Sequence, residues 1–166
     1  MKERIGAGFK YLVEVVDRSG RVVDSSIEKN LMPEEGQNYV LESLFKGGTV
    51  AATWYIGLYS GAYTPNPSDE MATFAAQAIE VTDYAETLRQ AFVPGSVVSG
   101  NVSNALSKAE FEFLADTTVT GGFISSAAGK GGTSGVLISA VRFSSPKQLS
   151  AGSILRVTAG FSLASL

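Results

Sequence analysis

The chain has 166 residues, which is the length of one ordinary domain and enough to bury a core. It contains neither cysteine nor histidine, which excludes a disulfide framework, a thiol nucleophile, a cysteine-type zinc site and every catalytic triad that needs histidine. Its formal net charge is −3 and only 17% of its residues are charged, so we expect a surface of small polar residues or one that other subunits partly cover.

The N-terminal part of the chain predicts two strands and one helix. Phe9, Tyr11, Val13 and Val15 recur at every second position, which predicts a strand over 9–16. After an Asp-Arg-Ser-Gly turn, residues 21–27 are expected to return as a second strand. Residues 1–8 have little pattern of their own and are a possible extended N-terminal arm. Pro33 suits the first turn of a helix that stops near Gly47. Its apolar residues share one face, which predicts a short amphipathic helix: Val40, Leu41, Leu44 and Phe45.

The rest of the chain is rich in strand patterns, apart from a long excursion over residues 61–94. The aromatic segment 53–60 predicts a central strand that buries Trp54. Within the excursion, residues 69–78 could form a helical turn or two with Asp69 as the cap. Further strands are expected at 109–113, 119–126, 137–143 (with Leu137, Val141 and Phe143 on one face) and 155–163. The pattern predicts one all-β domain with one short helix, an antiparallel β-sandwich that is jelly-roll-like.

The Gly-Lys pair at positions 129–130 raises the question of a phosphate-binding loop. That motif needs a glycine five residues before the Gly-Lys pair, and Ile124 stands there. Gly131 occupies the position of the Ser or Thr that would hold magnesium, and a strand pattern follows where a helix is required. The segment instead predicts a glycine-rich hairpin loop with Lys130 in solvent at its tip.

Carboxylates gather in the excursion at Asp69, Glu70, Glu80, Asp83 and Glu86. A pair of them could hydrolyse a glycoside or hold a hard cation, but no calcium-loop pattern is present. A solvated or subunit-facing acidic loop is the simpler interpretation. Arg89 is the only basic residue between Lys46 and Lys108, so it either ties the excursion down by pairing with these carboxylates or pairs across a subunit boundary.

The charges are divided along the chain. Residues 47–116 carry eight carboxylates against Arg89 and Lys108, whereas residues 117–166 carry four basic residues and no carboxylate. These blocks pair either within one chain or between subunits. The chain is acidic overall and has no basic stripe alternating with aromatic residues, so we expect no nucleic-acid binding. No apolar run is long enough for a membrane helix, and charged residues interrupt any signal-peptide-like segment, so we expect no membrane contact.

Several segments resemble a group of small virion proteins of tailed bacteriophages. They include "IEKNLMPEEGQNYVLESLFKGG", "TWYIGLYSGAYTP", "TDYAETLRQAF", "GNVSNALSKAEFEF" and "LRVTAGFSL", and the likeness covers roughly residues 28–163. These motifs are structural rather than catalytic. The resemblance implies a capsid decoration (cement) protein that is made in the host bacterial cytoplasm and sits on the capsid surface, without cofactor or catalytic residue.

The implied partners are the major capsid protein and further copies of the chain, with a homotrimer expected. Candidate residues for these subunit or capsid interfaces are Tyr63, Asp69, Glu70, Tyr84, Arg89 and Lys130. A tail or neck ring component fits the same features, and six-fold or twelve-fold assembly would indicate it. A receptor- or carbohydrate-binding module is a third alternative, which requires Trp54, Tyr55 and Tyr59 to be exposed.

Overall fold

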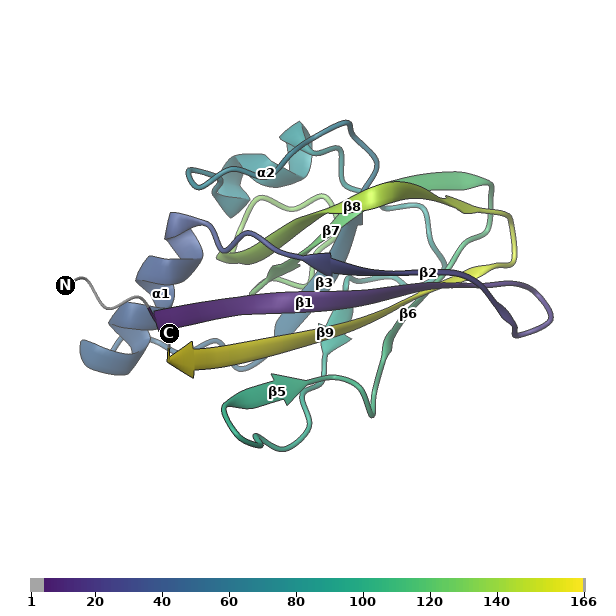
Figure 1. Cartoon of the computed structure of the whole chain (residues 1–166). Coiled ribbons are helices and arrows are strands. Elements are labelled where there is room, and N and C mark those ends of the chain that lie inside the picture. Colours follow the sequence, from purple (N-terminus) through teal and green to yellow (C-terminus); the bar gives the residue numbers. More distant parts are fainter. Residues whose placement is uncertain (1–4, 166) are drawn as a thin grey trace.

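The computed structural model describes residues 5–165, which form two antiparallel sheets packed face to face (Figure 1). The first sheet has the strand order β2 (Val22–Lys29), β1 (Ile5–Val16), β9 (Ile154–Ser165) and β5 (Asn101–Ser103), and β6 (Ala109–Glu112) also pairs with β9. The second sheet has the order β4 (Gln90–Phe92), β3 (Trp54–Tyr59), β7 (Thr117–Ser125) and β8 (Leu137–Leu149). The predicted all-β sandwich is confirmed, and its jelly-roll connectivity stays a prediction.

The longest pairing in the molecule joins β1 to β9. Its register runs from Ile5 opposite Ser165 to Val16 opposite Ile154. Tyr11 and Val13 point into the sandwich and are fully buried, as the alternating sequence predicts. Residues 5–8 therefore belong to β1 and do not form a separate arm, whereas the other residues of the expected arm, 1–4, lie outside the described residues.

The two sheets differ in how many of their faces are covered. The first sheet packs one face against the core, and charged pairs such as Arg156 with Glu110 lie on its other face. The second sheet is covered on both faces, because α2 (Met71–Gln77) packs over its outer side (Figure 1). Nearly every position of β7 is buried for this reason, and its sequence, TTVTGGFIS, shows no alternation of apolar and polar residues.

Helix α2 makes two helices within residues 5–165, where the sequence predicted one short helix and only a possible helical turn in the excursion. Asp69 does not cap it, which corrects the expectation, since Glu70 is the N-cap residue and its own side chain makes no capping hydrogen bond. The Asp69 carboxylate instead accepts hydrogen bonds from the Asn66 backbone N–H at 2.9 Å and the Tyr63 hydroxyl at 2.5 Å. Asp69 thus stabilises the turn that precedes the helix.

Strand β8 contains an irregularity that the sequence did not reveal. Ser125 pairs with Leu137 and the preceding Ile124 pairs with Ser139, so one residue of β8 is unpaired and the strand bulges. The bulge turns Leu137 toward α2, while Val141 and Phe143 face the sandwich core. The prediction that these three residues share one face is therefore wrong for Leu137.

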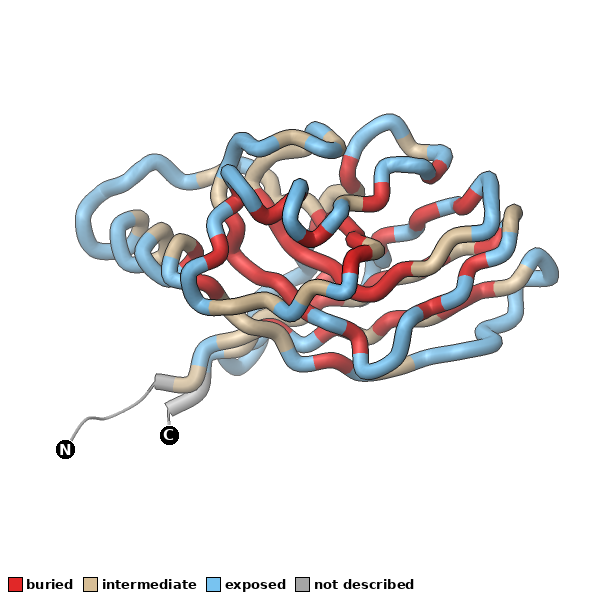
Figure 2. The backbone as a smooth tube through the Cα atoms, turned by 90° about the horizontal axis from the view of Figure 1, so that it is seen from above, coloured by how far each residue is buried: buried red, intermediate tan, exposed pale blue. Residues whose placement is uncertain are grey.

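Helix α1 (Glu34–Phe45) lies at the end of the sandwich where β1 begins and β9 ends (Figure 1). It touches β8 closely through Gly36, where a Cβ atom would lie 2.8 Å from the Ile138 Cα atom. Val40, one turn further along, packs against the core. The remaining apolar residues of the predicted face, Leu41, Leu44 and Phe45, are more than half exposed, and most of α1 is exposed in Figure 2.

Candidate functional site: an apolar cleft beside helix α1

An apolar cleft of about 300 Å³ opens between the two sheets beside α1. Both sheets and the helix contribute side chains to its wall. The lining residues are all apolar: Phe9, Val40, Leu44, Trp54, Phe92, Pro94, Val102, Ile124, Ile138, Phe161 and Leu163. Pockets that take small apolar groups have walls of this kind, with few polar groups to fix an orientation.

Exposed apolar side chains surround the opening of this cleft. The exposed fraction is 70% for Leu44 and 54% for Leu163, both of which line the cleft, and it is 78% for Phe45, the next residue of α1. Leu41, one turn earlier on the helix, is 54% exposed. We call Leu41, Leu44, Phe45 and the apolar cleft together the α1 surface. A contiguous apolar surface of this kind is typical of a binding interface.

Two aromatic rings fix the helix beside the cleft. Tyr39 of α1 meets Trp54 of β3 edge to face, with ring centroids 5.2 Å apart, and the Tyr39 hydroxyl accepts a hydrogen bond from the Ala51 backbone N–H. Trp54 is only partly buried, because one part of its ring lines the cleft. Tyr59, by contrast, is fully buried beneath α2. The aromatic residues that a carbohydrate-binding strand would need to expose therefore do not form an exposed row.

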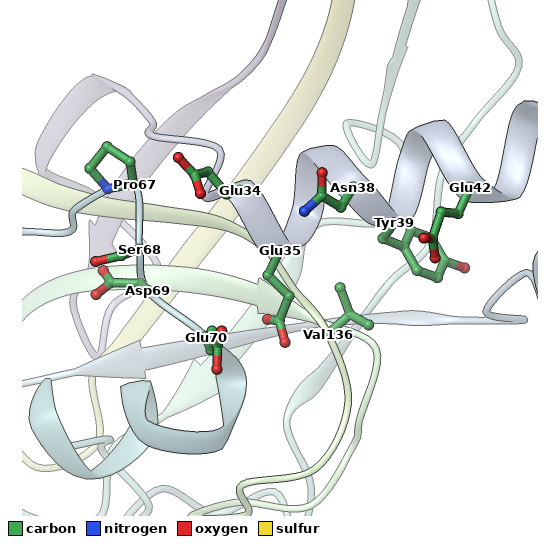
Figure 3. Close-up of a pocket in the computed structure, with 10 residues that line it drawn as sticks. All are labelled: Glu34, Glu35, Asn38, Tyr39, Glu42, Pro67, Ser68, Asp69, Glu70 and Val136. Carbon is green, nitrogen blue, oxygen red and sulfur yellow. The ribbon is translucent and has the colours of Figure 1, made fainter.

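A second hollow, with a volume of about 410 Å³, is acidic and lies between α1 and the segment that leads into α2 (Figure 3). Glu34 and Glu42 line it from the helix, and Asp69 and Glu70 line it from the opposite wall. Glu35 points from α1 toward the start of α2, where its carboxylate accepts hydrogen bonds from the backbone N–H groups of Met71 at 3.0 Å and Leu137 at 2.6 Å. Glu35 thus joins α1, α2 and β8.

The carboxylates of the excursion do not come together as a metal site. Within residues 5–165, no group of three or more Asp or Glu side chains is placed to hold a metal ion. Two of the five predicted residues are occupied by other contacts, since Glu80 pairs with Arg89 and Asp69 with Tyr63 and Asn66. Glu86 accepts a long hydrogen bond from the Glu112 backbone N–H at 3.3 Å. These carboxylates hold backbone segments rather than form a shared cluster.

Arg89 lies at the centre of a buried polar network. Its guanidinium donates to both carboxylate oxygens of Glu80, at 2.8 and 2.7 Å, and both side chains are at least 98% buried. The same guanidinium donates to the carbonyl oxygens of Ala127 and Gly132, at 2.9 and 3.0 Å. Glu80 also accepts from the Gly131 backbone N–H. Arg89 therefore ties the excursion to the glycine-rich loop within one chain, as one of the two predicted alternatives has it.

Lys130 joins the same network from the tip of the glycine-rich loop. Its ammonium group donates to the carbonyl oxygens of Thr82, Tyr84 and Glu86, at 2.7, 3.2 and 2.6 Å. It also lies 4.0 Å from the centroid of the Tyr84 ring, a cation–π contact. The expectation that Lys130 is in solvent is wrong, because three carbonyl oxygens take the place of its water shell. The predicted hairpin between β7 and β8 is confirmed. We call Glu80, Arg89, Lys130 and their partners the Arg89 network.

The charge blocks pair only in part with each other. In the basic C-terminal third, Lys147 lies 2.9 Å from Asp24 and Arg156 lies 2.8 Å from Glu110. Glu110 belongs to the acidic block 47–116, whereas Asp24 lies in the N-terminal part of the chain. Lys130 donates to carbonyl oxygens rather than to a carboxylate. Among the described residues one basic side chain of this block thus pairs with the acidic block, and pairing of the others between subunits stays a prediction.

The predicted interface residues fall into two groups. Asp69, Tyr84 and Arg89 are no more than 4% exposed, so their side chains offer almost no surface to a partner. Tyr63 and Lys130 are half-buried, and Glu70 is exposed on the wall of the acidic hollow. The reason is chemical: polar groups in a long loop must find partners when the loop folds onto the domain, and here they find them inside the chain.

The environment of four tyrosines raises the pKa of their hydroxyl groups. Burial is the main cause for Tyr11, Tyr59 and Tyr84, because an apolar surrounding disfavours the phenolate. For Tyr63, burial and the Asp69 carboxylate beside it together raise the pKa to about 12. These hydroxyls remain protonated at neutral pH, and at Tyr63 the proton is donated to Asp69.

A comparison with protein-family models found no match, and comparisons with curated proteins and with solved structures found none either. No helix within residues 5–165 is long and apolar enough to cross a membrane.

The α1 surface was not among the predicted sites, although one signal for it was present in the sequence. The helix carries four apolar residues on one face. It approaches β8 most closely at a glycine, and that contact is too small to bury the apolar area of all four. Leu163 gave no comparable signal, because it continues the alternation of β9 and only the end of the sandwich leaves it exposed.

Proposed function

We propose that this protein is a structural virion protein of a tailed bacteriophage, which decorates and stabilises the capsid by binding the major capsid protein and further copies of itself. It is made in the host bacterial cytoplasm and acts on the capsid surface, and no enzymatic role is assigned to it. The proposal rests on the sequence resemblance and on one structural observation, the exposed α1 surface.

The α1 surface supports this role because it exposes apolar area that a partner could bury. Leu44 and Phe45 expose most of their area although a helix face of this kind normally packs against a protein. Apolar burial contributes roughly 25 cal/mol per Å², so even a modest contact becomes strong when a lattice repeats it many times. A decoration protein has such repeated contacts.

The internal polar contacts support the same role because they make the domain rigid. The Arg89 network holds the excursion against the glycine-rich loop. The two hydrogen bonds of Glu35 hold α1 against α2 and β8. Further long-range hydrogen bonds join distant segments of the sandwich, among them Phe9 with Asn30 and Lys147 with Asp24. A domain that is rigid before it binds loses little conformational entropy on a capsid.

The proposal is tested by sedimentation of the purified protein with bare capsids assembled from the major capsid protein. We expect saturable binding to capsids and a rise in the temperature at which the capsids disrupt. Purified tails that lack capsids serve as the matched control. Binding to neither particle would overturn the proposed function, and binding to tails alone, with rings of six or twelve subunits, would replace it with the tail or neck alternative.

A further inference from the structure

The α1 surface carries a projection and a hollow side by side. Leu44 and Phe45 project from the last turn of α1, with exposed fractions of 70% and 78%. The apolar cleft of about 300 Å³ opens next to them, and Leu44 forms part of its wall. A surface with both features can receive the projection of an identical surface while inserting its own, as a self-complementary interface requires.

The charges of α1 favour an antiparallel partner of the same kind. Glu34 and Glu35 lie in the first turn, where Glu34 is exposed and the Glu35 carboxylate is already bonded to the backbone of Met71 and Leu137, whereas Lys46 directly follows the last turn. The Lys46 side chain is 73% exposed, and its ammonium group is 4.0 Å from Glu42, so that pair leaves it accessible. In an antiparallel pair of α1 helices, Lys46 of one copy lies toward the acidic first turn of the other. The two helix dipoles are then antiparallel, so the positive end of each helix lies beside the negative end of the other, which is favourable.

We propose that the α1 surface is the contact between two copies of this chain, in which Leu44 and Phe45 of each copy enter the apolar cleft of the other. This inference deepens the proposed function, because it assigns the contact between decoration subunits to particular residues. It does not depend on capsid binding for its test.

A second copy explains the surface better than a small apolar ligand does. A fatty-acid-sized ligand would fill the cleft but would leave Leu41 and Phe45 in water, since neither lines it. A partner that presents only a projection would fill the cleft and leave the same helix face uncovered. An identical α1 surface covers the cleft and the helix face together, and it matches the charge difference between the two ends of α1.

The test is the solution mass of the full chain over the micromolar range, measured by size-exclusion chromatography with light scattering. A contact in which each α1 surface receives the other is two-fold symmetric and closes at two copies, so we expect wild-type protein to form a dimer with twice the mass of the 17.4 kDa chain. A trimer would need a different contact and would overturn the inference. Phe45→Ser and Leu44→Ser should each weaken assembly by about tenfold or more, as removal of a central apolar anchor does. Ile27→Ser is the matched control, because Ile27 is 72% exposed on β2, outside the α1 surface, and this variant should assemble normally.

A charge exchange gives an independent measurement. Lys46→Glu should weaken assembly, and the double variant Lys46→Glu with Glu34→Lys should recover part of the loss. A wild-type protein that is monomeric throughout, or an oligomer that Phe45→Ser and Ile27→Ser affect equally, would overturn the inference. Saturable binding of decanoate by a monomer would assign the cleft to an apolar ligand instead. An oligomer that does not bind capsids would leave this inference standing and remove the proposed function.

Discussion

The Arg89 network and the α1 surface differ in exposure and in the number of contacts that their side chains make within the chain. Arg89 is 2% exposed and donates to a carboxylate and two carbonyl oxygens, whereas Phe45 is 78% exposed and packs against little. The first lies in a long excursion that the sequence suggested for binding, and the second lies on a helix that the sequence suggested for the core. The loop rich in charged residues therefore supports the fold, and the apolar helix face is available to a partner.

The difference follows from how charged groups and apolar groups interact with water. A buried charge is tolerated only with partners, so a loop that carries charges onto a domain is selected to satisfy them internally. An apolar side chain has no directional requirement and can stay exposed until a partner covers it. Substitutions in the Arg89 network should therefore destabilise the chain more than substitutions on the α1 surface.

Strongly alkaline pH should unfold the whole domain. The pKa of Tyr11, Tyr59, Tyr63 and Tyr84 is raised in the folded protein, to about 12 for Tyr63, above the unfolded value of about 10. Their contribution to the free energy of unfolding is complete below pH ~10 and is lost as the pH rises through the folded values. Tyrosinate absorbance and circular dichroism should therefore change together. Ionisation of all tyrosines near pH ~10 in a folded protein would contradict this expectation.

Removal of the buried guanidinium should cost most among the single substitutions. Arg89→Met leaves Glu80 buried without its charge partner, so we expect the free energy of unfolding to fall by about 3–5 kcal/mol in a denaturant titration. The double variant Arg89→Met with Glu80→Gln should regain part of this loss, because no buried charge remains. If Arg89→Met is as stable as the wild type, the Arg89 network is not a structural support.

Lys130→Met should have a smaller and more local effect. The three carbonyl oxygens of Thr82, Tyr84 and Glu86 lose a charged donor, for which we expect a loss of about 1–3 kcal/mol. Hydrogen exchange should speed up in residues 126–136 and 82–86 before it does elsewhere. Lys108→Met is the matched control, since its pair with Glu14 lies at the surface and is worth at most about 1 kcal/mol. Equal effects of the two substitutions would argue against a special role for Lys130.

Gly36→Ala tests how α1 is placed. A Cβ atom at this position would approach the β8 backbone to 2.8 Å at Ile138, so the helix must shift. The overpacking cost of about 1–3 kcal/mol exceeds the gain of about 1 kcal/mol in helix propensity, and we expect a net loss of about 1 kcal/mol. Asn38→Ala, at an exposed position of the same helix, should be neutral or slightly stabilising. A stabilised Gly36→Ala protein would show that the contact is looser than described.

Phe45→Ser should change the stability of one chain least. The side chain is exposed, so the free energy of unfolding measured at low protein concentration should stay within about 0.5 kcal/mol of wild type. Thermal unfolding of dilute protein provides the measurement, with Phe74→Ser as the contrasting variant, because Phe74 is fully buried beneath α2. A large loss of stability in dilute Phe45→Ser would place Phe45 in the fold rather than on a binding surface.

The β-sandwich and many of its core residues could be predicted from the sequence. Strict alternation placed Tyr11, Val13, Leu155 and Val157 in the core, because a strand with one covered face must alternate. The absence of cysteine and histidine, and the failed phosphate-loop spacing, were also readable from local sequence alone. These properties depend on residues that are close in the chain or on composition, which is why sequence was sufficient.

Which surfaces are exposed to solvent depends on long-range packing and could not be predicted from the sequence. Arg89 pairs with Glu80 only nine residues away, but its bonds to the glycine-rich loop and the place of Lys130 over the Tyr84 ring join segments that lie about 40 residues apart. The exposure of Leu44 and Phe45 depends on where Gly36 seats α1 against β8, which no periodicity within the helix reveals. A hydrophobic pattern shows that a face needs cover, but the packing of distant elements decides whether the chain itself supplies it.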